Sequence, residues 1–142
     1  MPKIYRHRIT VPADSIDANG HVNNVVYIQW MQDVATSHSD AQGCTRSLYE
    51  QLGSSWVVRA HRIEYLKPAF AGQEIEILTW VSNLQRTRSL RRYRFQNDQG
   101  TVLARAETDW VYINAASGRP CSVAPEVSQA FELVPEEEEP RE

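Results

Sequence analysis

The sequence predicts an α+β fold in which one long helix packs against an antiparallel sheet. Three observations support this prediction: a long helical stretch follows the first strand, four stretches of alternating polar and apolar residues follow the helix, and short turns join those stretches. Strands joined by short turns pair with antiparallel neighbours. The sheet is the only large surface on which the helix can bury its apolar side chains. We therefore expect a curved five-stranded antiparallel sheet wrapped around one long central helix.

The first strand and a polar loop precede the helix. Residues 3–11 alternate in polarity, as expected of a strand with one polar face, and Pro12 ends the alternation. Residues 14–23 are mostly polar and contain the turn signal Asn19-Gly20. We therefore expect a loop between the strand and the helix.

The central helix is predicted from about Asn24 to about Ala41. Asn23 and Asn24 mark its start, because an asparagine side chain can accept a hydrogen bond from an unpaired backbone N–H. Apolar residues occupy most sides of the first turns, so we expect other elements to enclose them. Gly43 ends the helix, and a short second helix is expected over residues 45–51. One face of the long helix carries Tyr27, Met31, Val34, Ala35 and His38 at helical spacing.

The strands of the sheet are predicted from their alternation of period two. They cover residues 55–68, 74–81, 86–95 and 101–113. The sequence Asn-Asp-Gln-Gly before the last strand is typical of a hairpin turn. A last short helix is expected over residues 125–131.

The acidic character of the chain is concentrated at its C-terminal end. The 142 residues include 15 Lys and Arg and 18 Asp and Glu, which gives a net charge of −3. Residues 135–142 hold five Glu and one Arg, so the remainder carries a charge of +1. We therefore expect one domain over residues 1–132 and a mobile acidic tail over residues 133–142. The nearly neutral body argues against nucleic acid as a partner.

The location and cofactor content are predicted from what the sequence lacks. No stretch resembles a signal peptide or a membrane span, so we expect a cytoplasmic protein without a membrane partner. Cys44 and Cys121 match no metal or redox spacing, and the four histidines are dispersed. The G-x-S-x-G, P-loop and H-E-x-x-H motifs are also missing. We expect neither a metal nor a cofactor.

The strongest candidate site is the loop that leads into the helix. Asp17 is a lone carboxylate a few residues before the helix N-terminus, where unpaired N–H groups and a partial positive charge stabilise negative charge. Each residue of this segment also has a purely structural interpretation. Asp17 suits a turn, Asn24 suits a helix cap, and Tyr27 and Trp30 suit the core.

Two motifs in this sequence resemble those of a known family. The pattern D-x-x-G-H-V-N-N-x-x-Y from Asp17, followed by an apolar helix and four strands, resembles the hotdog-fold thioesterases. It is most similar to the 4-hydroxybenzoyl-CoA thioesterase-like superfamily and its long-chain acyl-CoA thioesterases. Residues 64–69 and Gly72 resemble the Y-x-x-P-x-x-x-G-D turn of these proteins, with Gln73 in place of the acid. The resemblance covers about residues 3–115.

The resemblance implies that the protein hydrolyses acyl thioesters, usually acyl-CoA. It maps the catalytic carboxylate onto Asp17, as nucleophile or general base, and the oxyanion donors onto backbone N–H groups near Asn24. Some relatives carry a functional histidine at the position of Asn24, whereas the histidine of this chain is His21. We therefore expect only a supporting role for His21.

Substrate-binding residues are expected around the same loop. Asn23 is expected to hydrogen-bond the thioester or a water molecule. Tyr27 and Trp30 are expected to line the acyl pocket, and core packing is the alternative for both.

The phosphates of CoA require cationic partners. The candidates are Arg59, Arg62, Arg86 and Arg88. The alternative is a solvated outer face of the sheet, and Arg91 falls on the opposite face of its strand. An open sheet edge predicts pairing with further copies, as a homodimer or as a homotetramer built from two dimers.

Two other functions are compatible with the same fold. Hotdog hydratases and dehydratases carry D-x-N-P-x-H near this helix, and Asp17-Ala18-Asn19 begins in the same way. Here Gly20 replaces the proline and His21 arrives one residue early. A non-catalytic acyl-thioester-binding protein is the third hypothesis, because a fold alone does not establish an activity.

Overall fold

The structure, a computed structural model, describes residues 3–140 and confirms the α+β architecture. Each predicted helix and strand is present, and two short 3-10 helices are added. In chain order the elements are β1 (Ile4–Thr10), η1 (Ala13–Ser15), α1 (Asn24–Ala41), α2 (Arg46–Leu52), β2 (Ser54–Tyr65), β3 (Glu74–Leu84), β4 (Arg88–Asn97), β5 (Val102–Asn114), α3 (Pro125–Ser128) and η2 (Glu136–Glu138).

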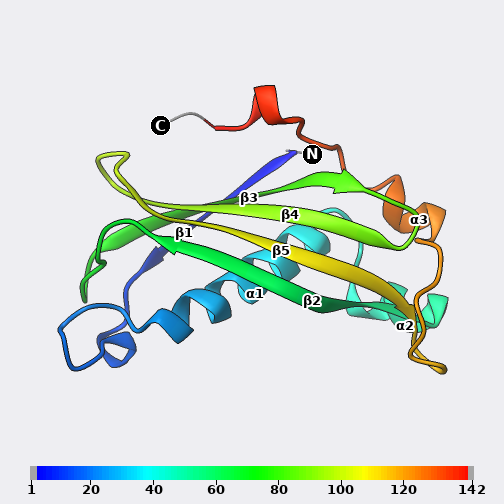
Figure 1. The fold of residues 1–142 in the computed structure, drawn as a ribbon, viewed down its shortest axis with the longest axis horizontal. Coiled ribbons are helices and arrows are strands. Elements are labelled where there is room, and N and C mark those ends of the chain that lie inside the picture. Colours follow the sequence, from blue (N-terminus) through cyan, green and yellow to red (C-terminus); the bar gives the residue numbers. More distant parts are fainter. Residues whose placement is uncertain (1–2, 141–142) are drawn as a thin grey trace.

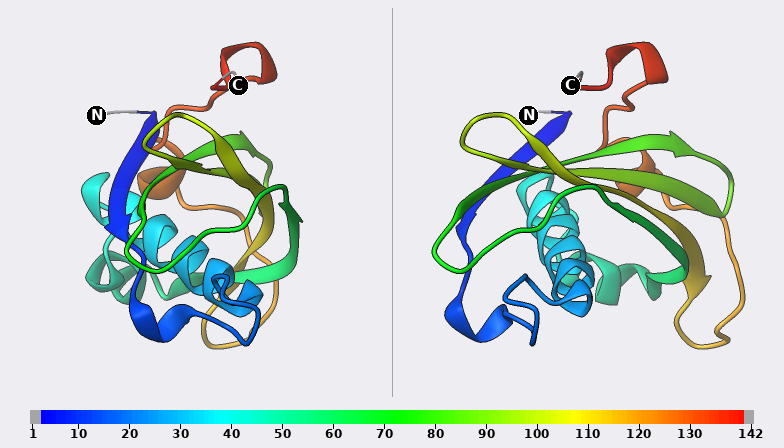
Figure 2. Two further views of the ribbon diagram at one scale, coloured as in Figure 1. Left: turned by 90° about the vertical axis from the view of Figure 1, so that its left-hand side faces the viewer. Right: turned by 60° about the vertical axis from the view of Figure 1, so that its left-hand side comes forward.

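The five strands form one sheet in the order β1-β3-β4-β5-β2, and every neighbouring pair is antiparallel. The sheet curls around α1, which lies along its concave inner face (Figure 1). The end-on view in Figure 2 shows how far the strands curve around the helix. β1 and β2 are the two edge strands, so each has one side unpaired within residues 3–140.

Local sequence determines where α1 begins and ends. The side chain of Asn23 accepts a hydrogen bond from the Val25 N–H at 3.0 Å and so caps the helix. After Gln42, Gly43 adopts a φ of +87°, a left-handed conformation that suits glycine and stops the helix. None of the helices within residues 3–140 has the length and apolar character needed to cross a membrane.

The core lies between α1 and the inner face of the sheet. Phe95 of β4 is fully buried, and its ring meets those of Tyr27 at 5.0 Å and Trp30 at 6.4 Å. Ile77 pairs with Phe95 across the β3–β4 ladder, which places both side chains on the inner face. The buried face of α1 consists of Tyr27, Trp30, Met31, Val34, Ala35 and His38.

The expectation that other elements enclose the first turns of α1 is wrong at Val25. This side chain is 70% exposed, because the sheet covers only one side of the helix start. The apolar character of the first turn therefore leaves a surface that this chain alone does not cover.

The C-terminal segment crosses the outer face of the sheet, the face turned away from α1 (Figure 1). Val134 is fully buried there, and its N–H donates to the Val81 carbonyl at 3.0 Å. Glu138 forms an ion pair with Lys3 at 2.7 Å. The mobility of the acidic tail stays a prediction, and its residues 141–142 lie outside the described residues.

Removing the central aromatic ring should weaken the whole fold. We expect Phe95→Ala to lower the free energy of unfolding by about 3–5 kcal/mol, because it leaves a cavity among buried rings. Leu133→Ala is the control, since Leu133 is 40% exposed and its truncation should cost no more than about 0.5 kcal/mol. Urea denaturation followed by far-ultraviolet circular dichroism measures both. Equal losses in the two variants would contradict the central position of Phe95.

Candidate functional site

Asp17 lies at the base of a tight turn in the loop before α1. Its Oδ1 accepts hydrogen bonds from the N–H groups of Asn19 at 2.9 Å and His21 at 3.2 Å. Its own N–H donates to the His21 carbonyl at 2.8 Å, and Gly20 takes a φ of +78° to close the turn. The turn role expected for Asp17 is therefore present, but it uses only one carboxylate oxygen. Within residues 3–140, the other oxygen, Oδ2, accepts no hydrogen bond.

Backbone hydrogen bonds fix this turn to the rest of the molecule. The Val22 N–H donates to the Ala69 carbonyl at 2.9 Å, and the Asn23 N–H donates to the Ser15 carbonyl at 2.8 Å. Together with the Ile16–Val22 bridge, these bonds hold Asp17 at the entrance to α1. The turn is thus anchored on both sides, and its carboxylate has a defined position.

The two asparagines at the helix start have different roles. Asn23 is the cap: its side chain accepts from the Val25 N–H, and its carbonyl accepts from the Val26 N–H at 2.9 Å. Asn24 is the first helical residue, and its N–H donates to no group within residues 3–140. This N–H is therefore available at the positive end of the α1 dipole, where an oxyanion is stabilised.

Tyr65 is a site residue that the sequence did not reveal. Its hydroxyl donates to the Asn24 carbonyl at 3.1 Å, and its ring packs edge-on against Tyr27 at 5.2 Å. Tyr65 ends the edge strand β2 and is 43% exposed. Partial burial raises the pKa of its hydroxyl, so the group stays protonated and can donate at neutral pH. The alternation predicted a strand through this position, but only the fold brings its ring to the helix start.

Exposed apolar side chains surround the helix start. Phe70 is 48% exposed, and its ring meets the His21 imidazole edge-on at 5.5 Å. The His21 side chain therefore packs against Phe70. The large exposed apolar residues of this region are Val25, Tyr65, Leu66 and Phe70. Such a cluster is typical of a surface that binds an apolar group or another protein.

Tyr27 and Trp30 are core residues. They are 2% and 8% exposed, and their rings meet edge-on at 5.3 Å. Burial raises the pKa of Tyr27 to about 12, so its hydroxyl is not a base at neutral pH. A contact between either residue and substrate stays a prediction.

The four candidate phosphate-binding arginines do not gather around Asp17 in one chain. Arg59 and Arg88 both pair with Asp109 on the outer face of the sheet, Arg59 at 3.6 Å. Arg62 is on the same face, 3.9 Å from Glu64.

Arg86 follows β3 and donates to the Ser122 hydroxyl at 3.0 Å. The outer-face alternative therefore describes the positions of Arg59, Arg62 and Arg88 in the single chain, and a contact of any of the four with CoA stays a prediction.

A large hollow lies along the second half of α1. A cavity of about 730 Å³ opens between the C-terminal half of α1, α2, the start of β2 and the inner face of β4 and β5. Its aromatic walls are Tyr49, Trp56, Trp110 and Phe131. The sequence did not predict this cavity, because its walls come from segments spread over much of the chain.

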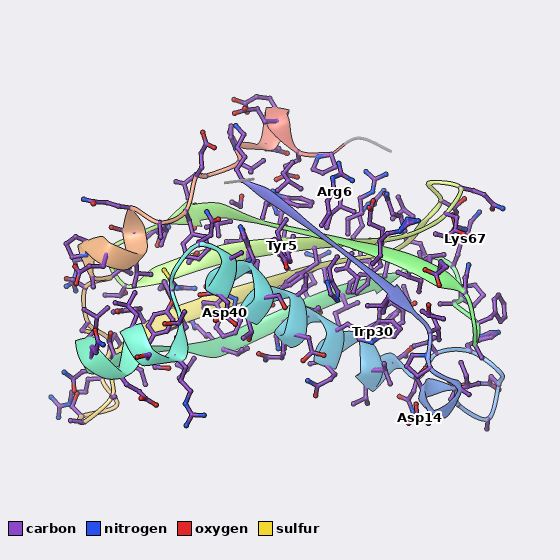
Figure 3. The ribbon with its side chains drawn as sticks, turned by 180° about the vertical axis from the view of Figure 1, so that it is seen from behind. Tyr5, Arg6, Asp14, Trp30, Asp40 and Lys67 are labelled. Carbon is purple, nitrogen blue, oxygen red and sulfur yellow. The ribbon has the colours of Figure 1, made fainter. Side chains whose placement is uncertain are left out.

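The Asp17 turn precedes the first residue of α1, whereas the cavity lies along the second half of the helix. Asn24 and Gln32, the first residue of α1 in the cavity lining, are eight residues apart, which corresponds to about 12 Å at roughly 1.5 Å per residue. Figure 3 shows Asp14, next to the turn, and Asp40, next to the cavity, at opposite ends of the helix. Within one chain, the Asp17 turn and the cavity therefore lie at different positions along α1.

Comparison with known proteins supplies a family and a fold. A family model for the thioesterase-like superfamily matches residues 11–131. The L-carnitine dehydrogenase/betainyl-CoA thioesterase of Ruegeria pomeroyi is 25% identical over 126 residues, which are 89% of this chain. The match spans only 26% of that longer relative.

Solved structures share the architecture. The DHNA-CoA thioesterase of Staphylococcus aureus superimposes with a TM-score of 0.82 at 20% identity, over 89% of this chain and 87% of that one. The 1,4-dihydroxy-2-naphthoyl-CoA thioesterase of Synechocystis gives 0.83 at 16% identity, over 90% and 95%. A hypothetical protein of Staphylococcus aureus in complex with CoA gives 0.85 at 19% identity, over 89% and 80%.

The roles of the two asparagines can be separated by mutation. We expect Asn23→Ala to lower the free energy of unfolding by about 1 kcal/mol, because it removes the cap of α1. Asn24→Ala should change it by no more than about 0.5 kcal/mol, since only the backbone of this residue is used. Thermal unfolding of both variants at matched concentration is the measurement. A larger loss for Asn24→Ala would reverse the assignment.

Proposed function

This chain belongs to the thioesterase-like superfamily, and we propose that it is a thioester hydrolase that acts on acyl-CoA with Asp17 as the catalytic carboxylate. One observation carries the assignment to Asp17: its carboxylate belongs to a turn anchored in the loop that leads into α1, and among residues 3–140 neither its Oδ2 nor the first N–H of the helix has a hydrogen-bond partner. The CoA complex of a structural neighbour supports CoA as the carrier.

The chemistry requires little beyond these two groups. The thioester carbonyl oxygen would accept a hydrogen bond from the Asn24 N–H at the positive end of α1. Negative charge develops on that oxygen when the carbonyl carbon is attacked, so the interaction is stronger in the transition state than in the ground state. The Tyr65 hydroxyl, by donating to the Asn24 carbonyl, holds the same peptide segment in place.

Two routes lead from this arrangement to the products. In the first, Asp17 Oδ2 attacks the carbonyl carbon, the C–S bond breaks, CoA leaves as a thiolate, and water hydrolyses the resulting mixed anhydride. In the second, Asp17 takes a proton from water, and the hydroxide attacks while the thiolate leaves. Single-turnover hydrolysis in ¹⁸O-labelled water distinguishes them, because only the first route can place the label in the Asp17 carboxylate.

A second copy would bring the cavity to the reactive turn. β2 is an edge strand of 12 residues with one side unpaired in the described chain. Antiparallel pairing of two β2 strands would place the Tyr65 end of one strand opposite the Ser54 end of the other. The helix start of one copy would then face the cavity of its partner. We therefore propose a homodimer as the active unit, with a homotetramer formed from two dimers as the larger assembly.

Neutralising Asp17 should abolish hydrolysis and leave the fold intact. We expect Asp17→Asn to lower kcat/KM for acyl-CoA by about 10²- to 10⁴-fold, because the amide is neither nucleophile nor base. Its oxygen can still accept from the Asn19 and His21 N–H groups, so the turn should persist. Asp14→Asn is the matched control, since Asp14 is an exposed carboxylate three residues earlier. Thiol release measures both variants, and equal rates for wild type and Asp17→Asn would remove Asp17 from the mechanism.

The shared site of the dimer can be tested by mixing two inactive variants. Thr36 is an exposed residue of α1 at the cavity wall, and Thr36→Trp should block the cavity without disturbing the core. Each heterodimer of Asp17→Asn with Thr36→Trp would contain one intact site, so co-expression should restore about a quarter of wild-type activity. Each variant alone is the control. Isolated heterodimers without activity would contradict a site built from both copies.

A further inference from the structure

The cavity contains a buried arginine with an unusual set of partners. Arg91 of β4 is 6% exposed and is part of the cavity lining. Its Nη1 donates to His38 Nδ1 at 2.9 Å and to Thr79 Oγ1 at 3.1 Å. Because Nδ1 accepts this bond, it carries no proton. His38 is therefore a neutral acceptor and not an anionic partner of the guanidinium.

Within residues 3–140, Arg91 forms no ion pair with a carboxylate, in contrast to Arg88 and Arg92 of the same strand. The nearby groups that can become anionic are Tyr93 and Tyr49. Burial raises the pKa of both hydroxyls, that of Tyr49 to about 12, so they are neutral at pH 7.

Burial also lowers the pKa of Arg91, but a guanidinium stays charged in proteins. Burying a cation without an anionic partner raises the free energy of the folded state, and Arg91 has no such partner within residues 3–140.

The surroundings of Arg91 suit an organic acid. The Phe131 ring lies 5.7 Å from the guanidinium carbon and offers a partial substitute for an anion. Trp56 and Trp110 add apolar walls. The other charged residues of the lining are Asp40, Arg46 and Glu50, all of them exposed, and Arg46 pairs with Glu50 at 3.1 Å. The cavity therefore has apolar walls and one buried cation, Arg91, which we call its cationic floor.

We propose that this floor binds a carboxylate at the far end of the acyl group, so that the enzyme prefers acyl-CoA thioesters whose acyl chain ends in a carboxylate. This inference rests on the proposed function and on the dimer that brings the cavity to Asp17. Arginine pairs with carboxylates through two parallel hydrogen bonds, and such pairs are strongest where water is excluded. The apolar walls would hold the methylene or aromatic part between the two ends.

Two other ligands are compatible with parts of the cavity and are distinguished by Arg91. Aromatic walls alone would suit a quaternary ammonium group, such as that of a betainyl thioester. The guanidinium would repel that cation. A phosphate of CoA would also pair with arginine, but it would require the hydrophilic end of the substrate to enter the apolar cavity.

The first test compares matched substrates on the full chain. Thiol release is measured for glutaryl-, adipoyl- and suberoyl-CoA against pentanoyl-, hexanoyl- and octanoyl-CoA, with betainyl-CoA as the cationic member. At the best length, we expect kcat/KM for the acid to exceed that for the neutral partner by about 10- to 100-fold, as for a hydrogen-bonded charge pair. Equal or lower values for the acids, or a preference for betainyl-CoA, would overturn the proposal.

The second test changes Arg91 itself. Arg91→Met should lower kcat/KM for the acids by about 10- to 100-fold and keep or raise that for the neutral partners. This reversal cannot result from misfolding. Arg91→Lys should retain part of the preference, since it keeps a charge but loses the paired donors. Arg92→Met is the matched control, because Arg92 is the next residue and points to the outer face. An equal loss for acids and neutral substrates in Arg91→Met would assign Arg91 a structural role only.

Binding without turnover separates this inference from the proposed function. Calorimetry with free adipate should show binding to wild type and at least about 10-fold weaker binding to Arg91→Met, whereas free CoA should bind both equally. If no acyl-CoA is hydrolysed, the proposed function fails, and the adipate titration still decides the carboxylate site. A matching loss of CoA affinity in Arg91→Met would place a phosphate in the cavity and overturn the proposal.

Discussion

The packing of α1 on the concave face of the sheet is the interaction on which the rest of the structure depends. The first half of the helix packs through Tyr27 and Trp30 against the ring of Phe95. In its second half, His38 accepts a hydrogen bond from Arg91. Because α1 has 18 residues, its two ends are distant, and each end has a separate chemical environment. One end offers a backbone donor beside a carboxylate. The other end closes a hollow with a cationic floor. The helix thus separates the groups for which we propose a catalytic role from the groups for which we propose a role in substrate selection.

Much of the fold could be predicted because local patterns determine it. The alternation of polarity predicted the strands of the sheet, since successive strand side chains point to opposite faces. The bounds of α1 followed from Asn23 and Gly43, which act within a few residues of their own position. Val25 was misplaced because exposure at one side of a helix depends on what the rest of the chain covers. The buried contact of Val134 with the outer face was missed for the same reason.

The candidate site also combines local features with features that depend on the fold. The turn of Asp17 and the cap of the helix could be predicted because neighbouring residues form them. The contact of Tyr65 with Asn24 joins residues 41 positions apart, and no local pattern contains it. The sequence placed Arg91 on the face opposite to Arg92, but the lack of a carboxylate partner depends on the packing of several elements. Which charges pair across a fold therefore cannot be predicted from a single sequence.

The ion pair between Lys3 and Glu138 bears on how this domain can be connected to other polypeptides. It links the start of β1 to the C-terminal segment, which lies over the face of the sheet turned away from α1 (Figures 1 and 2). A domain whose first strand starts and whose last segment ends away from its candidate site can be joined to another polypeptide without covering that site. The Ruegeria pomeroyi relative, in which the matching segment is 26% of a longer bifunctional protein, has the organisation that such modularity permits.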